Sequence, residues 1–285
     1  MYLSKILRES AIKANETSKV DQNPGSSFNT QNGRKLNILD LCSGSGCISL
    51  LLYETLRHHY PSLRVNGWDI SEIALQNTQH NITHNVGLQT FEYDGIDDHI
   101  AFHQGDVFKP SSKLEHHLQE ANIIISNPPY ISEQQFQTET EESVRRYEPK
   151  IALVPDMAIA KRLFNDDSHV VRPEDIFYHQ LVSYFSRLPK CLMMVTEVGD
   201  DGQAVRVAKM LIGQHKAETQ NSVTIEIWRD WPEQEDPENK EKSINIEGTN
   251  VQIVGAGNMR AVVVFRGKNV VLKNLFDQVA APNSV

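Results

Sequence analysis

Short apolar runs alternate along the chain with segments whose apolar residues recur at helical spacing. The run at 36–41 (LNILDL) predicts a buried strand, and the periodic segment at 47–59 predicts a helix. Further strands are expected at 63–69, 99–104, 122–126, 191–198, 223–228 and 261–266, and further helices at 2–14, 71–84, 174–188 and 201–212. Strands that alternate with helices favour an α/β fold with a parallel sheet that helices cover on both faces.

Polar residues stand at the ends of four of these predicted strands. They are Asp40–Gly46 after 36–41, Asp69 at the end of 63–69, Asp106 after 99–104, and Asn127–Tyr130 after 122–126. In sheets of this kind, ligands bind at the carboxyl ends of the strands. We therefore expect these groups to converge on one edge of the sheet and to form a binding site.

Composition narrows the function classes. The 285 residues carry 28 basic and 37 acidic side chains, a net charge of −9, which argues against a protein that binds nucleic acid mainly through its phosphates. The length suits one large domain or two small ones. Three cysteines exclude a disulfide scaffold and fit a reducing compartment. No apolar run approaches the roughly 20 residues of a membrane-spanning helix, so no membrane partner is expected.

The glycine-rich turn after the first strand permits close approach of a ligand to the backbone, because glycine has no Cβ. Gly44 and Gly46 are followed by Ser49 where the dinucleotide fingerprint needs a third glycine. A dinucleotide, a sulfonium nucleoside and a simple tight turn all remain open from this pattern. Asp69 is placed to accept hydrogen bonds from ribose hydroxyls, or else to serve as a turn or N-cap residue.

The segment Asn127-Pro128-Pro129-Tyr130 is the most specific signal in the sequence. The prolines stiffen the chain and remove donors, so that nearby carbonyls stay free to accept hydrogen bonds. The asparagine amide offers an acceptor and a donor, and the tyrosine offers a flat face for stacking. Together they predict a rigid clamp for a planar group that carries an NH₂; the alternative is a proline-rich turn.

Seven segments together resemble one family, the S-adenosylmethionine-dependent methyltransferases with an NPPY motif. Within it they resemble the protein-(glutamine-N5) methyltransferases of class 1 release factors, in their bacterial and mitochondrial branch. The segments are DLCSGSGCISLLL (40–52), WDISEIALQNTQHN (68–81), HQGDVF (103–108), IIISNPPYIS (123–132), YEPKIALVP (147–155), TEVGDDGQAV (196–205) and IVGAGNMRAVVVFRG (253–267). The resemblance implies a Rossmann-like, seven-stranded class I fold, mostly parallel with an antiparallel last strand.

The resemblance also implies roles for individual residues, with S-adenosyl-L-methionine as cofactor and no metal. Cofactor binding is implied for Asp40, Cys42, Ser43, Gly44, Ser45, Gly46, Asp69, Ile70, Asp106, Val107 and Asn127. Asn127 and the Pro128 carbonyl would accept the two N–H bonds of a glutamine amide, while Pro129 and Tyr130 complete the substrate site. Cys42 replaces the first glycine of the family's loop, and cysteine does not easily adopt a positive φ.

We expect a methyltransferase catalytic domain at 36–268 and a C-terminal tail at 269–285. Residues 1–35 are expected to be an N-terminal helix and polar linker, left from a truncated N-terminal region, because the family's helical domain and proline-arginine motif are not visible. Elsewhere, His80 and His84 could form a metal pair but lack a third ligand nearby. The pairs His58-His59 and His116-His117 are expected to be solvated.

The resemblance implies N5-methylation of the glutamine in the GGQ motif of a peptide-chain release factor, which would be the protein partner. A mitochondrial location is implied, otherwise a cytoplasmic one, and we expect a monomer that does not bind nucleic acid directly. Two alternatives stay open. One is an adenine-N6 methyltransferase of DNA or RNA, since the exocyclic NH₂ of adenine fits the same clamp. The other is an inactive, truncated paralogue that acts as a binding protein.

Overall fold

A computed structural model describes residues 2–3, 5–8, 35–88, 99–156, 158–159, 172–215, 223–235 and 242–266. The chain forms two compact units. Unit 1 contains Met1–Ile125, Lys190–Leu192 and Arg266–Val285, and unit 2 contains Ser126–Pro189 and Met193–Phe265. Much of the expected linker before residue 35 and the expected C-terminal tail lie outside the described residues.

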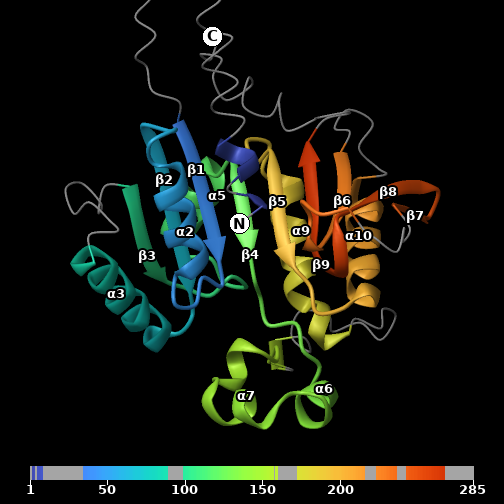
Figure 1. Cartoon of the computed structure of the whole chain (residues 1–285), viewed down its shortest axis with the longest axis horizontal. Coiled ribbons are helices and arrows are strands. Elements are labelled where there is room, and N and C mark those ends of the chain that lie inside the picture. The colour runs from blue at the N-terminus through green and yellow to red at the C-terminus, as the bar shows by residue number, and fades with distance from the viewer. Residues whose placement is uncertain are drawn as a thin grey trace, which may run out of the picture. The chain divides into compact units, whose positions relative to one another are not determined.

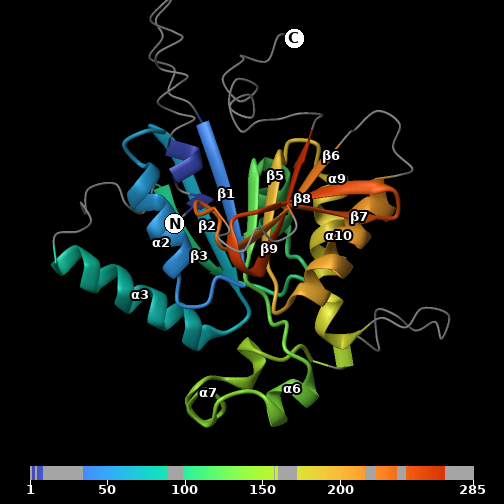
Figure 2. The ribbon, with the colours of Figure 1, turned by 45° about the vertical axis from the view of Figure 1, so that its right-hand side comes forward.

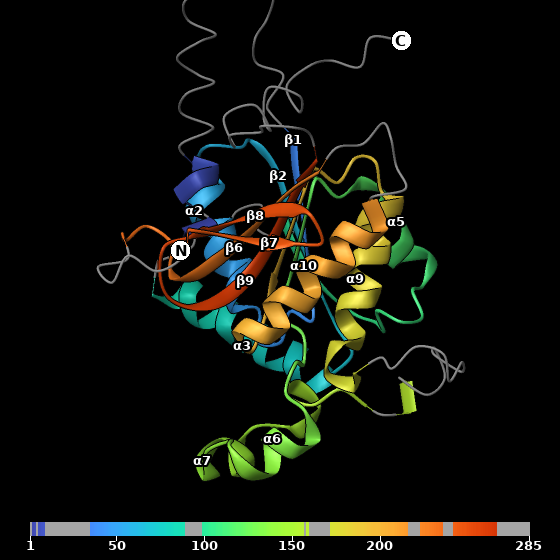
Figure 3. The ribbon, with the colours of Figure 1, turned by 90° about the vertical axis from the view of Figure 1, so that its right-hand side faces the viewer.

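Unit 1 is built on strands in the order β3-β2-β1-β4. Their bounds are β1 Lys35–Leu41, β2 Ser62–Asp69, β3 Ile100–Gln104 and β4 Ile123–Ser126, whose last residue opens unit 2. The pairs β1–β2 and β2–β3 are parallel. Helices α2 (Cys47–Leu56) and α3 (Glu72–Gly87) lie on one face of these strands, and α5 (Ser112–Glu120) lies on the other (Figures 1 and 3).

The strands of unit 1 have their apolar residues inside. All residues of β1 after Lys35 are buried, which explains why this run shows no alternation of apolar and polar positions. Trp68 is the largest fully buried side chain of the unit and belongs to β2. Helix α3 begins after Ser71, whose side chain accepts a hydrogen bond from the Ala74 N–H, as an N-cap residue does.

Unit 2 has strands in the order β5-β9-β6-β8-β7. The bounds are β5 Met193–Glu197, β6 Val223–Trp231, β7 Ser243–Ile246, β8 Thr249–Val254 and β9 Ala256–Arg266. Strands β5 and β9 are antiparallel, with Val195 opposite Val263. Helices α9 (Ile176–Arg187) and α10 (Asp201–His215) pack side by side (Figure 2).

Unit 2 also carries a small helical lobe between residues 133 and 152. It contains α6 (Glu133–Thr138), α7 (Glu142–Tyr147) and the 3₁₀ turn η1 (Lys150–Ala152), and a second 3₁₀ turn, η2 (Pro173–Asp175), precedes α9. None of the residues of α6, α7 or η1 is buried. The lobe is therefore held by polar contacts, among them a capping box in which Ser132 and Gln135 bond each other's backbone.

The predicted α/β class, with a largely parallel sheet and an antiparallel last strand, is confirmed. The strand count differs, because nine strands are described instead of the seven expected. The additional pair is the hairpin β7–β8, which lies between the strands expected at 223–228 and 261–266. Several boundaries also differ; for example, α3 extends to Gly87, and β9 begins at Ala256 instead of residue 261.

Candidate functional site

The loop between β1 and α2 is shaped by glycines in left-handed backbone conformations. Gly44 and Gly46 have φ angles of 54° and 78°. A Cβ on Gly46 would lie 2.8 Å from Thr78 Cγ2 and 3.0 Å from Phe102 Cζ, so this position has no room for a side chain. A Cβ on Gly44 would meet no atom within 4 Å, so the backbone there faces open space. The loop therefore presents bare backbone to a ligand at Gly44 and packs tightly at Gly46.

Helix α3 holds this loop from outside. The Thr78 hydroxyl donates to the Gly44 carbonyl at 3.0 Å, and the Asn81 amide donates to the Ser45 carbonyl at 2.9 Å. Thr78 is the one buried residue of a helix that is otherwise exposed or half-buried. Sequence reasoning gave neither residue a role. The sequence does contain a signal for them: Thr78 and Asn81 are three positions apart and therefore share one face of the helix that follows the strand ending at Asp69.

Cys42 adopts the left-handed conformation that the sequence made doubtful, with φ of 62°. It is one of two non-glycine residues with positive φ among the described residues, the other being Glu247. A side chain in this region costs about 1 kcal/mol or more relative to glycine. The loop thus keeps the backbone path that a glycine would permit and bears the strain of a cysteine.

Asp40 lies fully buried beneath the loop. The Ser49 hydroxyl donates to Asp40 Oδ2 at 2.7 Å, while Asp40 Oδ1 and the Ser43 hydroxyl have no partner among the described residues. Burial, and secondarily the charge of Asp69, raise the pKa of Asp40 to about 7. Two buried polar atoms without partners, beside a stretch of open backbone, fit a polar ligand bound at this loop.

Asp69 occupies the end of β2 and bonds the two segments on either side. Its Oδ2 accepts the Gly44 N–H and its Oδ1 accepts the Ser71 N–H, each at 2.8 Å. This is the turn-residue role that the sequence left open; both oxygens keep further lone pairs for a ligand. The next residue, Ile70, is an exposed apolar side chain.

Asp106 and Val107 follow β3 in a tight turn. Asp106 Oδ1 accepts the Phe108 N–H at 2.8 Å, so this carboxylate stabilises its own turn. Val107 is buried. The loop 40–46, Asp69 and this turn are the parts of unit 1 that the sequence singled out for cofactor binding.

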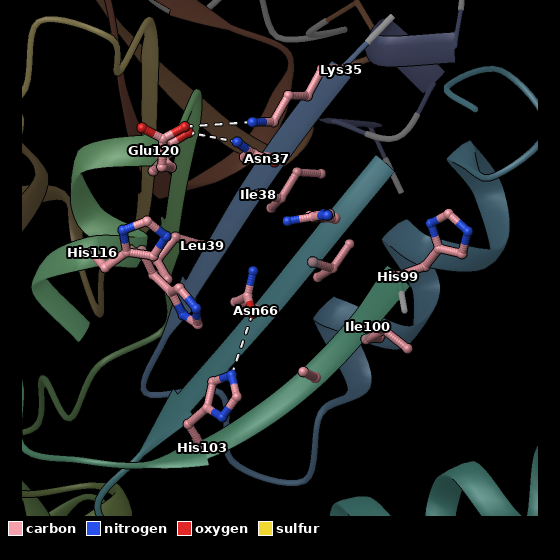
Figure 4. A pocket seen from close by; sticks show the side chains of 15 residues that line it. Lys35, Asn37, Ile38, Leu39, Asn66, His99, Ile100, His103, His116 and Glu120 are labelled. Carbon is pink, nitrogen blue, oxygen red and sulfur yellow. Dashed lines mark hydrogen bonds and ion pairs between the residues drawn. The ribbon is translucent and has the colours of Figure 1, made fainter. Parts of the chain in front are cut away.

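A polar groove of about 410 Å³ lies elsewhere on unit 1, between β1–β3 and α5 (Figure 4). His103 Nδ1 lies 3.2 Å from the Lys113 ammonium, and the Trp68 indole N–H donates to His117 Nδ1 at 3.1 Å. Burial, followed by the charge of Lys113, lowers the pKa of His103 to about 4 and also lowers the pKa of His117. Both imidazoles are therefore neutral at pH 7 and accept these bonds.

This geometry corrects one expectation. His116 is exposed, as predicted, but His117 is half-buried and bonded to Trp68, so the prediction that both are solvated was wrong. Figure 4 also shows Lys35 and Asn37 reaching Glu120, which ties α5 to β1. The groove is best explained as the polar contact between α5 and the strands, because most of its polar groups bond each other.

In unit 2, the Asn127–Tyr130 segment follows β4 directly. Asn127 is exposed, and its side-chain amide has no hydrogen-bond partner within the described parts of the chain. Pro128 and Pro129 are buried, and Tyr130 is half-buried. Asn127 therefore contributes no side-chain hydrogen bond to the described part of the fold, and its amide is accessible on a backbone stiffened by two buried prolines.

Tyr130 is held at both ends. Its hydroxyl donates to Glu197 Oε1 at 3.1 Å, and its carbonyl accepts from the Gln203 amide at 3.3 Å. Gly199 packs on the ring, since a Cβ there would lie 2.9 Å from Tyr130 Cδ2. Burial, and then the charge of Glu197, raise the pKa of Tyr130 to about 12, so the phenol keeps its proton.

Gln203 is the centre of this anchoring network. It is buried, and its oxygen accepts the Gly199 N–H at 2.8 Å, while its amide also donates to Asp175 Oδ1 at 2.9 Å. The segment 196–205 belongs to the resemblance, but the resemblance implied no role for Glu197 or Gln203. Beside Tyr130 lies a hollow of about 550 Å³, which Gln203 lines together with Arg172, Arg206 and residues of α6.

Neither a metal site nor a membrane-spanning helix is found in the described ranges. No group of three or more His, Cys, Asp or Glu residues there could hold a metal ion. His80 and His84, which the sequence offered as a possible metal pair, are both exposed on α3. Within the same ranges, no helix has the length and apolar character needed to cross a membrane.

Comparison with known proteins identifies the relatives of this chain. Residues 25–146 match the model of the methyltransferase small domain. A Schizosaccharomyces pombe protein named probable MRF1 mitochondrial N(5)-glutamine methyltransferase mtq1 is 32% identical over 190 residues, which are 62% of this chain and 52% of the relative. A release factor glutamine methyltransferase of Bacteroides thetaiotaomicron is 30% identical over 190 residues, 65% of this chain and 59% of the relative.

A third relative, a ribosomal protein uL3 glutamine methyltransferase of Bradyrhizobium diazoefficiens, is 30% identical over 48% of this chain and 38% of its own length. The chain thus spans about half the length of the curated relatives it matches. Among solved structures, the human METTL16 catalytic domain in complex with a MAT2A hairpin is 12% identical with a TM-score of 0.45, covering 83% of this chain and 66% of that one.

These relatives agree in the reaction that their names state, whereas they differ in the protein that is modified. The predicted resemblance to the glutamine methyltransferases is therefore confirmed by similarity to relatives with that name, and residues 25–146 are similar to the methyltransferase small domain.

Proposed function

We propose that this protein transfers a methyl group from S-adenosyl-L-methionine to the side-chain amide nitrogen of a glutamine, in the GGQ motif of a peptide-chain release factor. The observation that carries the proposal is the Asn127–Tyr130 segment. It presents an exposed amide, which bonds no other residue of the described ranges, on a backbone stiffened by two buried prolines and next to a tyrosine whose ring is held in place. The names of the relatives support glutamine as the acceptor.

The donor would be held by the loop Asp40–Gly46 with Asp69. The unpartnered oxygens of Asp40 and Ser43 fit its polar groups, and the open space at Gly44 fits its approach to the backbone. S-adenosyl-L-methionine supplies an electrophilic methyl group on a sulfonium. The contribution of the loop is to bind the donor and to keep it in one orientation.

The acceptor would be held by Asn127, Pro128 and Tyr130. An amide nitrogen is a poor nucleophile, because its lone pair is delocalised into the carbonyl. Asn127 Oδ1 and the Pro128 carbonyl would accept the two N–H bonds, orient the NH₂ and stabilise the positive charge that develops on the nitrogen. Tyr130 would pack on the amide plane, and the proton released from the nitrogen leaves to solvent.

A second candidate acceptor is a glutamine of ribosomal protein uL3, because relatives with that name also match this chain. Both acceptors use the same amide chemistry, so the clamp does not separate them. The similarity to a relative with a mitochondrial name supports a mitochondrial site of action. We also propose that residues 36–268 form the catalytic domain.

The test incubates the full chain with labelled S-adenosyl-L-methionine and four acceptors: a release factor, its GGQ→GGA version, ribosomal protein uL3 and duplex DNA. Label on the GGQ glutamine alone, located by mass spectrometry, is the expected result. Label on uL3 alone would replace the release factor by the second acceptor. Label on DNA, or equal label on the GGA version, would overturn the glutamine proposal.

Calorimetry with S-adenosylhomocysteine addresses the inactive-paralogue alternative. We expect binding, because the loop keeps its backbone path and offers unpartnered polar atoms. No detectable binding, together with no transfer to any acceptor, would overturn the proposed function and leave the inactive-paralogue alternative standing.

A further inference from the structure

We propose that Glu197 is a positioning residue for methyl transfer: its carboxylate holds the Tyr130 ring in the plane on which the acceptor amide packs. The inference rests on the proposed function and adds to it a residue that acts through Tyr130. It starts from the contact of Tyr130 Oη with Glu197 Oε1 at 3.1 Å.

Glu197 is itself firmly placed. It is the last residue of β5 and pairs with Ala261 of the antiparallel strand β9. Its backbone carbonyl accepts the Tyr178 hydroxyl at 2.9 Å, and Tyr178 is fully buried. A side chain that projects from such a point has little freedom, so it can define where the Tyr130 hydroxyl lies.

The ring of Tyr130 is thereby fixed at three places. Gln203 holds the backbone carbonyl, Gly199 packs against the ring, and Glu197 holds the far end of the side chain. Without the last contact, the hydroxyl would lose the hydrogen bond that fixes it, and the ring could shift about its side-chain torsions on the face that Gly199 does not cover. A misplacement of about 1 Å at a reacting group can cost on the order of 100-fold in rate.

The choice of a carboxylate needs a reason, because burying one is unfavourable. Burial raises the pKa of Glu197, and Arg260, which pairs with Asp230 at 2.9 Å, acts in the opposite direction. A neutral acceptor would satisfy the phenol at lower cost. A charged acceptor makes a stronger hydrogen bond and places negative charge behind the ring, where it favours an amide nitrogen that becomes positive.

The experiment is a double-mutant cycle on the full chain, with the acceptor that proves active. The variants are Glu197→Ala, Tyr130→Phe and the double variant. We expect each single change to lower kcat by roughly 10- to 100-fold and the double variant to be no worse than Tyr130→Phe alone. Effects that multiply in the double variant would overturn the inference, because Glu197 would then act independently of the phenol.

Two further variants separate positioning from folding. Glu197→Gln retains an acceptor oxygen but not the charge, and it is expected to recover part of the activity that Glu197→Ala loses. Glu226→Ala is the matched control, since Glu226 is another strand carboxylate of unit 2 that accepts from an aromatic group, the Trp228 indole, at 2.8 Å. It is expected to leave kcat unchanged. Equal losses in Glu226→Ala and Glu197→Ala would overturn the inference in favour of a general effect on the fold.

A readout without activity keeps the inference distinct from the proposed function. Tyrosinate absorbance is titrated in wild type and in Glu197→Ala, with Tyr130→Phe subtracted to isolate Tyr130. Loss of the carboxylate should lower the Tyr130 pKa from about 12 toward the ordinary value of 10. An unchanged Tyr130 titration would refute the contact itself, whereas a changed titration without transfer to any acceptor would refute only the proposed function.

Discussion

The loop proposed to bind the donor (the donor loop, unit 1) and the segment proposed to bind the acceptor (the acceptor segment, unit 2) are built in opposite ways. The loop 40–46 owes its path to left-handed backbone at Cys42, Gly44 and Gly46, and its supports from α3 bond backbone carbonyls. The acceptor segment owes its rigidity to prolines and its placement to the side chains of Glu197 and Gln203. The loop should therefore be sensitive to changes of backbone conformation, and the segment to deletions of side chains.

The largest effect is expected from Asn127→Ala in the acceptor segment. Removal of one aligned hydrogen-bonding group at a reacting centre costs about 100- to 1,000-fold in kcat. Binding of S-adenosylhomocysteine, measured by calorimetry, should change little if the amide serves the acceptor more than the donor. Asn250→Ala, at an exposed position of β8, is the control and should leave both quantities as they are. Wild-type kcat in Asn127→Ala would refute the clamp.

A large effect on the donor loop is expected from Gly46→Ala. The new methyl group meets Thr78 Cγ2 at 2.8 Å in a backbone with φ of 78°, so overpacking and strain add to about 3 kcal/mol of lost stability. Urea denaturation measures the loss, and donor binding should fall with it.

The matched control is Gly87→Ala at the end of α3. A Cβ there meets nothing within 4 Å, and alanine is the better helix former. This variant should be as stable as wild type or slightly more so. If Gly46→Ala were equally harmless, the loop would not depend on its backbone conformation, and the contrast between the two regions would fail.

Asp40→Asn gives a pH-dependent effect in the donor loop. Unfolded Asp40 ionises near pH 3.8, whereas the folded residue keeps its proton up to about pH 7. A raised acid pKa stabilises the fold most at pH below 3.8, and this contribution is lost as the pH rises through 7. The difference corresponds to roughly 4 kcal/mol at most. The asparagine side chain cannot ionise, so the variant should match wild type near pH 4 and melt at higher temperature above pH 7.

Ser49→Ala sharpens the same prediction. The Ser49 hydroxyl donates to Asp40 Oδ2 at 2.7 Å and lowers the pKa of Asp40. Removal of this hydroxyl should raise the pKa of Asp40, so the loss of stability should extend to higher pH. Melting curves of Asp40→Asn that run parallel to those of wild type from pH 4 to pH 9 would contradict the burial of an ionisable Asp40.

The contrast between the two regions also explains what the sequence could predict of the fold. Strand β1 was predictable because an unbroken apolar run is a local signal. Helices α5, α6 and α7 were not predicted. Helix α5 buries only Leu114 and Leu118, and α6 and α7 bury no residue, so the sequence has no long periodic apolar pattern at these helices. The hairpin β7–β8 did carry a signal: apolar residues alternate on both sides of a turn at Glu247-Gly248 with φ of 50° and 86°.

The candidate site likewise has a part that the sequence could predict and a part that it could not. The glycines and the prolines are read from neighbouring residues, because they restrict the backbone at their own positions. Glu197 and Gln203 follow Tyr130 by 67 and 73 residues, and their contacts exist only once unit 2 has folded. Likewise, Asp69 was placed correctly at its strand end, but its bonds to the Gly44 and Ser71 N–H groups depend on where the loop returns.

The smallest effect is expected from Cys42→Gly, and this effect is the most specific to the donor loop. Glycine relieves a left-handed φ of 62°, worth about 1 to 2 kcal/mol, but it also adds freedom to the unfolded chain, worth about 0.5 to 1 kcal/mol in the opposite direction. The net gain in stability should be under roughly 1 kcal/mol, and binding of S-adenosylhomocysteine should tighten by about two- to threefold.

Glu247→Gly is the control, because Glu247 is the other described non-glycine residue with positive φ and lies in the β7–β8 turn of unit 2. Its contact with Lys209 is exposed and contributes little to stability. Both variants should therefore gain similar stability, while only Cys42→Gly should change donor affinity. If both variants left donor affinity unchanged, the strain at Cys42 would be a property of the fold alone, and the loop would bind its ligand by side chains as the acceptor segment does.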